Sequence, residues 1–295
     1  IILCFNKFMS LIKGIYAASM SVLNDNLTLN VSKTINHAEK LIDNGCHGVA
    51  MFGSTGQAQL IPISEKIELL NHLSKSNYKD KFIIGTGLNS LGETINLMKV
   101  AKSLSFKKFL IMPPAFYRFG DIDVINYYSK ILEKVPECKI ILYNFEKLCG
   151  YIFSVECIKE LVKKFPKQII GVKDSSYNLF ENLKLDNFSV LPGSESKLLK
   201  GLELGCSGII TATCNVSSPL ARQVYDDFFN KKKQTINQKL CDVRNTFEKY
   251  NLISALHSYY SINDPVYKNV LPPLSILNAI DKKELTNNLE KLNFY

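Results

Sequence analysis

A lysine that directly follows a short apolar segment is the residue of this chain best suited to covalent chemistry. Residues 168–172 (Gln-Ile-Ile-Gly-Val) predict a buried strand, and Lys173 comes next. Burial penalises the charged form of a lysine, and a free amine attacks a ketone carbonyl to form a Schiff base. The alternative is that the long side chain extends from the strand end to solvent, as lysines usually do.

Polar residues and glycines follow other apolar segments in the same way. The backbone N–H groups and hydroxyls of Gly53–Gly56 (Gly-Ser-Thr-Gly) can hold a carboxylate, although a tight turn alone explains this segment equally well. Tyr143 ends another apolar segment, where it either transfers protons or closes the core with its hydroxyl in water. Gly193–Ser196 and Ser207–Ile209 contain glycines that let a ligand approach the backbone.

These residues need a fold that collects the ends of several strands. Short apolar segments alternate with segments of helical periodicity along most of the 295 residues. The predicted strands are Gly14–Ala18, Gly48–Phe52, Phe82–Gly85, Lys108–Met112, Lys139–Tyr143, Ile169–Lys173, Ser189–Leu191 and Gly208–Thr211. The predicted helices between them are Val31–Asp43, Ser64–Ser74, Leu91–Ser103, Asp121–Glu133, Val155–Lys164 and Ser196–Leu204. This alternation predicts an α/β fold, a (β/α)8 TIM barrel, whose chemistry lies at the carboxyl ends of the strands. An open doubly wound sheet is the alternative, but no G-x-G-x-x-G turn follows the first strand.

The pattern becomes wholly helical near residue 225. We therefore expect a catalytic barrel over residues 10–225 and a C-terminal helical extension over residues 226–295. Helices are expected in the extension at Gln234–Tyr250, Leu252–Tyr259 and Lys283–Leu292. Met9 resembles a natural start, which leaves open whether residues 1–8 are native, and the apolar opening is too short for a signal peptide.

Composition narrows the classes of partner. The net charge of +9 is spread along the chain, with one short run at Lys231–Lys233, which favours a small anionic substrate over nucleic acid. The longest apolar runs are shorter than the roughly 18 residues of a membrane span. Eight cysteines without a C-x-x-C pair and four histidines without i, i+4 spacing indicate free thiols, a cytoplasmic location and no metal site.

Together the motifs resemble the pyruvate-dependent Schiff-base lyases of the dihydrodipicolinate synthase and N-acetylneuraminate lyase family. The residues that carry the resemblance are Gly14–Ala18, Gly53–Gly56, Pro113–Tyr117, Tyr143-Asn144, Gly171–Asp174 and Gly193–Glu195. The resemblance implies that Lys173 forms an imine with pyruvate, that Ser54 and Thr55 receive the pyruvate carboxylate, and that Tyr143 relays protons. It also implies a pocket lined by the backbone around Ile209, no diffusible cofactor, and a homodimer or homotetramer.

Position alone suggests which further residues contact the aldehyde that pyruvate joins. Gly53 and Gly193 would line the pocket. Contacts to substrate hydroxyls are expected from Asp174, Ser175, Glu195 and Ser196. The family often uses a relay tyrosine from a neighbouring subunit. The matching position here is Phe116, so either the adjacent Tyr117 replaces it or the relay is shorter.

Departures from the family pattern bear on the substrate. Dihydrodipicolinate synthases carry Y-N-x-P-x-R-T-G where this chain has Tyr143–Gly150, and Leu148 stands at the position of the carboxylate-binding arginine. The sequence therefore favours an aldolase for a 2-keto-3-deoxy sugar acid or a sialic-acid-like substrate. A 4-hydroxy-tetrahydrodipicolinate synthase is one alternative. A non-catalytic keto-acid-binding barrel is the other, and it would not need both Lys173 and Tyr143. Gln57 also replaces the family's usual glutamate.

Overall fold

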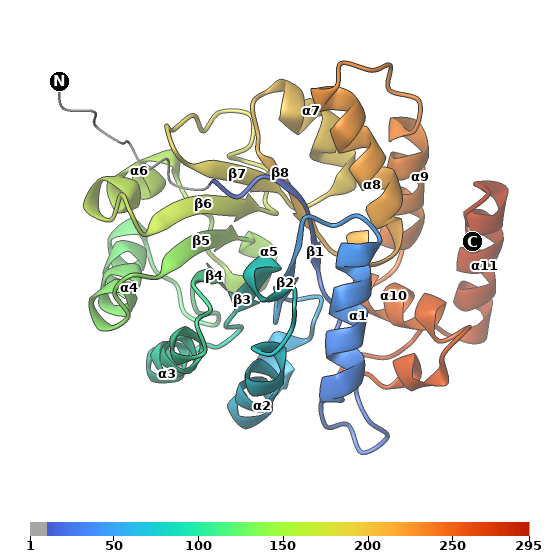
Figure 1. The fold of residues 1–295 in the computed structure, drawn as a ribbon, viewed down its shortest axis with the longest axis horizontal. Coiled ribbons are helices and arrows are strands. Elements are labelled where there is room, and N and C mark those ends of the chain that lie inside the picture. The colour runs from blue at the N-terminus through green and yellow to red at the C-terminus, as the bar shows by residue number, and fades with distance from the viewer. Residues whose placement is uncertain (1–10, 295) are drawn as a thin grey trace.

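The computed structural model describes residues 11–294 and shows eight parallel strands surrounded by helices (Figure 1). The strands are β1 (Gly14–Ala18), β2 (Gly48–Met51), β3 (Phe82–Gly85), β4 (Lys108–Ile111), β5 (Lys139–Asn144), β6 (Ile169–Asp174), β7 (Ser189–Pro192) and β8 (Gly208–Thr211). The helices are α1 (Val31–Asp43), α2 (Ile63–Leu73), α3 (Leu91–Ser103), α4 (Asp121–Lys134), α5 (Glu146–Cys149), α6 (Val155–Lys164), α7 (Leu198–Glu203), α8 (Cys214–Phe229), α9 (Asn237–Glu248), α10 (Leu252–Tyr260) and α11 (Ala279–Lys291).

The sheet closes almost completely into a barrel. Its strand order is β7-β6-β5-β4-β3-β2-β1-β8, so the last strand pairs with the first. Between β7 and β8, the N–H of Ser207 donates to the carbonyl of Val190 at 2.9 Å. The predicted TIM barrel is therefore confirmed, with the C-terminal helices packed to one side of it (Figure 1).

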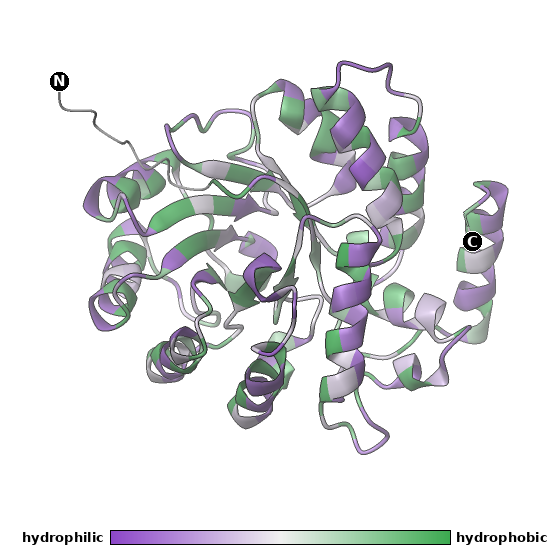
Figure 2. Cartoon of the chain, in the orientation of Figure 1, coloured by the Kyte–Doolittle hydropathy of each residue, from purple (hydrophilic) through white to green (hydrophobic). Residues whose placement is uncertain are grey.

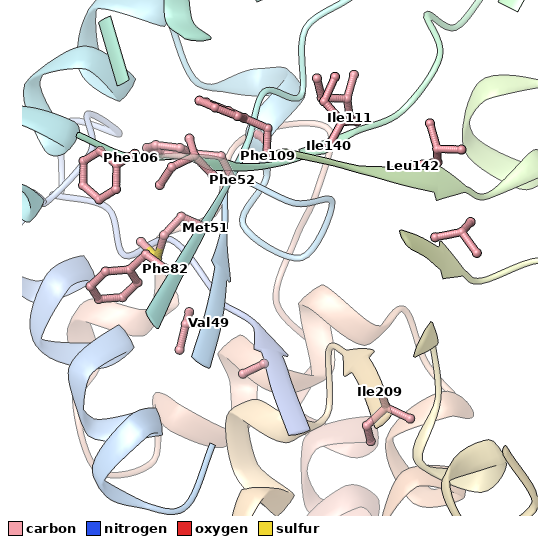
Figure 3. Close-up of a cluster of buried hydrophobic side chains, with 14 of the residues drawn as sticks. Val49, Met51, Phe52, Phe82, Phe106, Phe109, Ile111, Ile140, Leu142 and Ile209 are labelled. Atoms are coloured by element: carbon pink, nitrogen blue, oxygen red, sulfur yellow. The ribbon is translucent and has the colours of Figure 1, made fainter. Parts of the chain in front are cut away.

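Each strand is buried on both faces. Along β1, Ile15 and Ala17 belong to the layer between strands and helices, whereas Tyr16 and Ala18 face the barrel interior. Figure 3 shows part of the outer layer, where side chains from β2, β3, β4, β5 and β8 point away from the interior. This double burial explains why the strands are nearly continuous apolar segments in the sequence.

The helices cover the barrel with one apolar face each. In α1, Ala38 and Leu41 are buried, and the side chain of Asn30 caps the helix by accepting from the N–H of Lys33. Figure 2 shows the same division around the barrel, with largely hydrophobic strands and helices that alternate between hydrophilic and hydrophobic residues.

Helix α8 was not predicted from the sequence, because Pro219 interrupts its pattern. A proline has no N–H to donate to the carbonyl four residues earlier. That carbonyl, on Asn215, accepts instead from the hydroxyl of Tyr260 in α10. The short helix α5 was also not predicted. The expected boundary at residue 225 falls inside α8, and the division into two domains stays a prediction.

The helical extension is joined to the barrel by apolar and polar contacts. Met20 and Val22, after β1, pack with residues of α9, α10 and α11. Two buried histidines lie in the polar part of this junction between the barrel and the extension. His37 contacts Tyr267 Oη at 2.9 Å and Asn215 Oδ1 at 2.8 Å, and His257 contacts the backbone oxygen of Tyr267 at 2.8 Å.

Gln57 connects this junction to the loop after β2. Its side-chain oxygen accepts from the N–H of Leu271 at 2.7 Å, and its amide nitrogen lies 3.3 Å from Nε2 of His257. A neutral His257 can accept from the Gln57 amide while its Nδ1–H donates to Tyr267. The departure from the family's glutamate thus has a structural account, since an amide supplies both a donor and an acceptor.

The two junction histidines predict a loss of stability in acid. Burial lowers the pKa of His37 and of His257 from 6.5 to about 4. Because the unfolded chain binds these protons more tightly, their stabilising contribution is complete above pH 6.5 and is lost as the pH falls towards 4. The loss is about 3 kcal/mol for each histidine. Urea unfolding at pH 7 and at pH 4.5 measures it. His257→Gln should lose less stability between the two pH values than the native chain, whereas His72→Gln, at an exposed histidine, should behave as native. Equal losses in all three proteins would contradict the assignment.

Candidate active site

An irregularity in β6 determines where Lys173 points. Ile140 of β5 pairs with Ile169, but the next residue of β5, Ile141, pairs with Gly171, so one residue of β6 is unmatched. Ile169 packs in the outer layer, and in a regular strand without a bulge strict alternation would place Lys173, four residues later, on the same side. After the bulge, Val172 faces outward and Lys173 faces the interior.

Gly171 makes this bulge sterically feasible. A Cβ at this position would lie 2.6 Å from the backbone oxygen of Ser189 on β7, a distance that side-chain carbons do not tolerate. The glycine therefore allows β6 and β7 to approach closely next to the lysine.

Lys173 is a buried amine without a polar partner. Its side chain is 3% exposed, and Nζ lies 4.1 Å from the centre of the Tyr143 ring. Within residues 11–294 no hydrogen bond or ion pair reaches Nζ. A lysine this deeply buried is normally paired. The amine is thus available for chemistry.

The neighbouring carboxylate of Asp174 points away from the lysine. It accepts from the side-chain amide of Asn144 at 2.8 Å and from the backbone N–H groups of Tyr177, Leu179 and Phe180 at 2.9 Å. Burial raises the pKa of Asp174, and these donors oppose that rise. Its role in the structure is to hold the loop after β6, and its expected contact to substrate stays a prediction.

Tyr143 and Ser54 form a pair beside the amine. Tyr143 is the register partner of Lys173 on β5, and its hydroxyl lies 3.0 Å from Oγ of Ser54. Among the described residues, the backbone N–H groups of Ser54 and Thr55 donate to no protein acceptor. The site thus combines an amine, a hydroxyl pair that can pass a proton, and free N–H donors for an anion.

A cavity of about 280 Å³ contains this group. Its lining includes Lys173, Tyr143, Ser54, Thr55, Phe145, Lys147, Leu148, Ser175, Tyr177, Gly193, Ala212, Arg244, Glu248, Asn251, Leu252 and Ile253. At the β7 end, a Cβ on Gly193 would lie 2.3 Å from Oγ of Ser175, so the glycine leaves room for that hydroxyl. Six of the residues expected from the sequence are therefore together: Lys173, Tyr143, Ser54, Thr55, Ser175 and Gly193.

Other expected residues lie elsewhere. Glu195 is fully buried outside the lining and accepts from the hydroxyls of Thr211 and Thr213, each at 2.8 Å. Ile209 points into the outer layer (Figure 3), because strand alternation puts Ala212, three residues later, on the cavity. Tyr117 lies on the loop after β4 and is 78% exposed.

A second cavity adjoins the first. It measures about 270 Å³ and shares Ser54, Tyr143, Leu148 and Ile253 with the Lys173 cavity. Gly53 lines this second, mainly apolar space. Because Leu148 lies between the two cavities, its side chain affects both.

No local sequence pattern predicted the residues that the extension adds to the cavity. Arg244 and Glu248 are on α9, and Asn251 follows it. They are far from the strand ends in sequence, and their i, i+4 spacing is typical of any exposed helix.

A second buried lysine provides a contrast. Lys66 on α2 is fully buried, and its Nζ donates to the carbonyl oxygen of Thr86 at 2.8 Å. Burial lowers the pKa of Lys66 to about 8. Unlike Lys173, it has a hydrogen-bond partner and lines neither cavity, which gives it a structural role.

Residues 11–294 contain no group of three or more His, Cys, Asp or Glu side chains arranged to hold a metal ion. No helix in the same range has the length and apolar character needed to cross a bilayer.

Comparison with known proteins identifies similar sequences and folds. Residues 11–292 match the dihydrodipicolinate synthetase family. An N-acetylneuraminate lyase of Actinobacillus pleuropneumoniae is 30% identical over 72% of this chain and 74% of its own length. A 2-dehydro-3-deoxy-D-gluconate/2-dehydro-3-deoxy-phosphogluconate aldolase of Picrophilus torridus is 27% identical over 75% and 85%. A prophage protein of the dihydrodipicolinic acid synthase family from E. coli K12, solved in complex with pyruvate, has a TM-score of 0.87 at 22% identity and covers 97% of this chain and 100% of its own.

Replacement of Gly171 tests the bulge. Gly171→Ala should cost about 1–3 kcal/mol of stability, because the new methyl group collides with the β7 backbone. It should also displace Lys173 and sharply reduce borohydride trapping of the pyruvate imine that the family resemblance predicts on that residue. Gly92→Ala is the control, since this helical glycine has space around it. Thermal unfolding and mass spectrometry measure the two effects. A Gly171→Ala protein with native stability and trapping would contradict the role of the bulge.

Proposed function

Because the chain belongs to the dihydrodipicolinate synthetase family and is a lyase, we propose that it is a class I aldolase in which Lys173 forms an imine with pyruvate. The main support is the buried, unpartnered Nζ of Lys173 beside the Tyr143–Ser54 pair. A buried amine, a proton carrier and anion donors thus line one cavity.

The proposed reaction uses each of these groups. The amine adds to the keto carbon of pyruvate and water leaves, which gives an iminium ion. Loss of a methyl proton forms an enamine, whose carbon attacks the carbonyl carbon of an aldehyde. Water then releases the product and regenerates Lys173, and cleavage is the reverse sequence. Tyr143 and Ser54 would carry the protons, while Ser54 and Thr55 hold the carboxylate. This chemistry requires neither a metal nor a diffusible cofactor.

We assign the substrate to the 2-keto-3-deoxy sugar acids or sialic-acid-like compounds. Polar groups along the cavity, including Ser175, Tyr177 and Asn251, support a hydroxylated substrate. The named aldolase and lyase relatives are consistent with this class. The alternative, 4-hydroxy-tetrahydrodipicolinate synthase, is also represented among the relatives, for example in Methanopyrus kandleri at 28% identity. Leu148 argues against it, since it offers no charge to a second carboxylate.

Assembly and location follow as further proposals. Phe116, Tyr117 and Ile122 are 90%, 78% and 83% exposed, and such apolar side chains favour contact between copies of the chain. We therefore propose a homodimer or homotetramer in which Tyr117 reaches a neighbouring site. The cysteines of the described residues are all free, which supports a reducing, cytoplasmic location.

The imine can be trapped directly. The native protein mixed with pyruvate and borohydride should gain one reduced pyruvyl group, located on Lys173 by peptide mass spectrometry. Lys173→Arg should gain none. Tyr143→Phe should still be trapped but should turn over about 10²- to 10⁴-fold more slowly, because proton transfer is impaired.

Lys66 is an internal control for this experiment, because it is a buried lysine outside the cavity. An adduct on Lys66, or full turnover by Lys173→Arg, would refute the proposed mechanism. Absence of any adduct would favour a non-catalytic keto-acid-binding barrel.

Leu148 can be used to test the substrate assignment. Leu148→Arg would restore a guanidinium where synthases of the family hold an acceptor carboxylate. A hydrogen bond to a charged group contributes about 1.5–3 kcal/mol, so kcat/KM with aspartate semialdehyde should rise about ten- to a hundredfold. Leu148→Met, which keeps an apolar side chain, is the control. If the native chain already uses aspartate semialdehyde better than hydroxylated aldehydes, the synthase alternative holds.

A further inference from the structure

The helical extension forms part of the wall of the Lys173 cavity. Strand ends supply Ser54, Tyr143 and Lys173, whereas α9 and the segment after it supply Arg244, Glu248 and Asn251. A cavity with these two sides can hold the reacting carbons at the strand ends and the remainder of a substrate against the extension.

Arg244 is the centre of a charged cluster on this second side. Its guanidinium is 4% exposed, and Nη1 donates to Thr213 at 2.9 Å, to Thr211 at 3.2 Å and to Glu195 at 3.4 Å. Its Nε and Nη2 donate to the two carboxylate oxygens of Glu248, each at 3.3 Å. The fork of two parallel bonds fixes the Glu248 carboxylate in one orientation.

The two carboxylates of the cluster have different environments. Glu195 is fully buried, and its carboxylate oxygens accept from the hydroxyls of Thr211, Thr213 and Ser217. Its hydrogen-bond acceptors are therefore occupied within the protein. The Glu248 side chain is 51% exposed and lines the cavity. Arg244 engages one lone pair on each of its oxygens, which leaves acceptors free for a ligand.

These groups suit hydroxyls better than a carboxylate. A hydroxyl both donates and accepts, and the cluster offers free acceptors on Glu248 and a remaining N–H on Arg244. Within the cluster the two glutamates exceed the single arginine by one negative charge, which disfavours an anion beside Glu248, while Lys147 supplies a positive charge to another part of the lining. Tyr177, held in a left-handed backbone conformation with φ of 61°, adds a further polar side chain to the lining.

We propose that Glu248, oriented by Arg244, is the specificity determinant that binds the hydroxyl groups of the aldehyde partner. This inference rests on the proposed function and narrows it: the end of the substrate far from pyruvate is hydroxylated and uncharged. The helical extension is then part of substrate recognition.

Three aldehydes offered with pyruvate test the proposal: glyceraldehyde, propanal, which has the same carbon chain without hydroxyls, and succinic semialdehyde, which carries a carboxylate. Glu248→Gln keeps the shape of the side chain and removes its charge. Its kcat/KM should fall about ten- to a hundredfold with glyceraldehyde. With propanal it should stay within about twofold of native, and with succinic semialdehyde it should rise.

Glu290→Gln on α11 is the matched control, because it removes one exposed negative charge from the same extension. It should leave all three aldehydes unaffected. A second variant, Arg244→Met with Glu195→Gln, removes the orienting guanidinium without leaving a buried carboxylate unpaired, and it should show the same selective loss.

Pyruvate trapping on Lys173 distinguishes a failure of the proposed function from a failure of the Glu248 assignment. A native protein that forms no adduct overturns the proposed function and this inference with it. An adduct in native and Glu248→Gln proteins, combined with equal effects on glyceraldehyde and propanal or with no effect on either, overturns the inference alone.

Discussion

The site depends on one β-bulge in β6. The bulge at Ile170–Gly171 reverses the alternation of the strand, so that Lys173 faces the barrel interior beside Tyr143. Without it, the amine would point into the apolar layer under the helices. The close approach of β7, which only a glycine permits, is the steric condition for this geometry. The register shift between β5 and β6 thus decides whether the Lys173 amine faces the cavity.

The barrel and the helical extension each supply part of the cavity lining. Strand ends supply short, rigid groups such as Ser54 and Tyr143, placed by register. The extension supplies longer side chains, Arg244 and Glu248, from helix α9, which forms part of the cavity wall. The loop after β2, which carries Ser54 and Thr55, is also hydrogen-bonded to the extension, because Gln57 contacts His257 of α10 and accepts from the N–H of Leu271.

Much of the fold could be predicted from the sequence, because double burial produces distinct apolar segments. All eight predicted strands, including Gly14–Ala18 and Gly208–Thr211, have the bounds seen in the structure or differ from them by one residue. The side of β6 that carries Lys173 could not be derived from periodicity, since a bulge leaves no compositional mark beyond one glycine. Helix α8 was missed because its stabilising donor, Tyr260, comes 41 positions after Pro219. Glu195 and the side chain of Ile209 lie outside the cavity lining, which sequence order does not reveal, and the predicted contacts of Glu195 and of the backbone around Ile209 with substrate stay predictions.

The hydrogen bond from the Tyr260 hydroxyl to the carbonyl of Asn215 links the extension, through α10, to α8 of the barrel. Helix α8 packs against β1, the first strand, yet its backbone is fully satisfied only once α10 has been made and docked. During synthesis α8 therefore cannot complete its backbone hydrogen bonding until residue 260 has left the ribosome. The last helix of the barrel and the extension consequently reach their final structure in the same step.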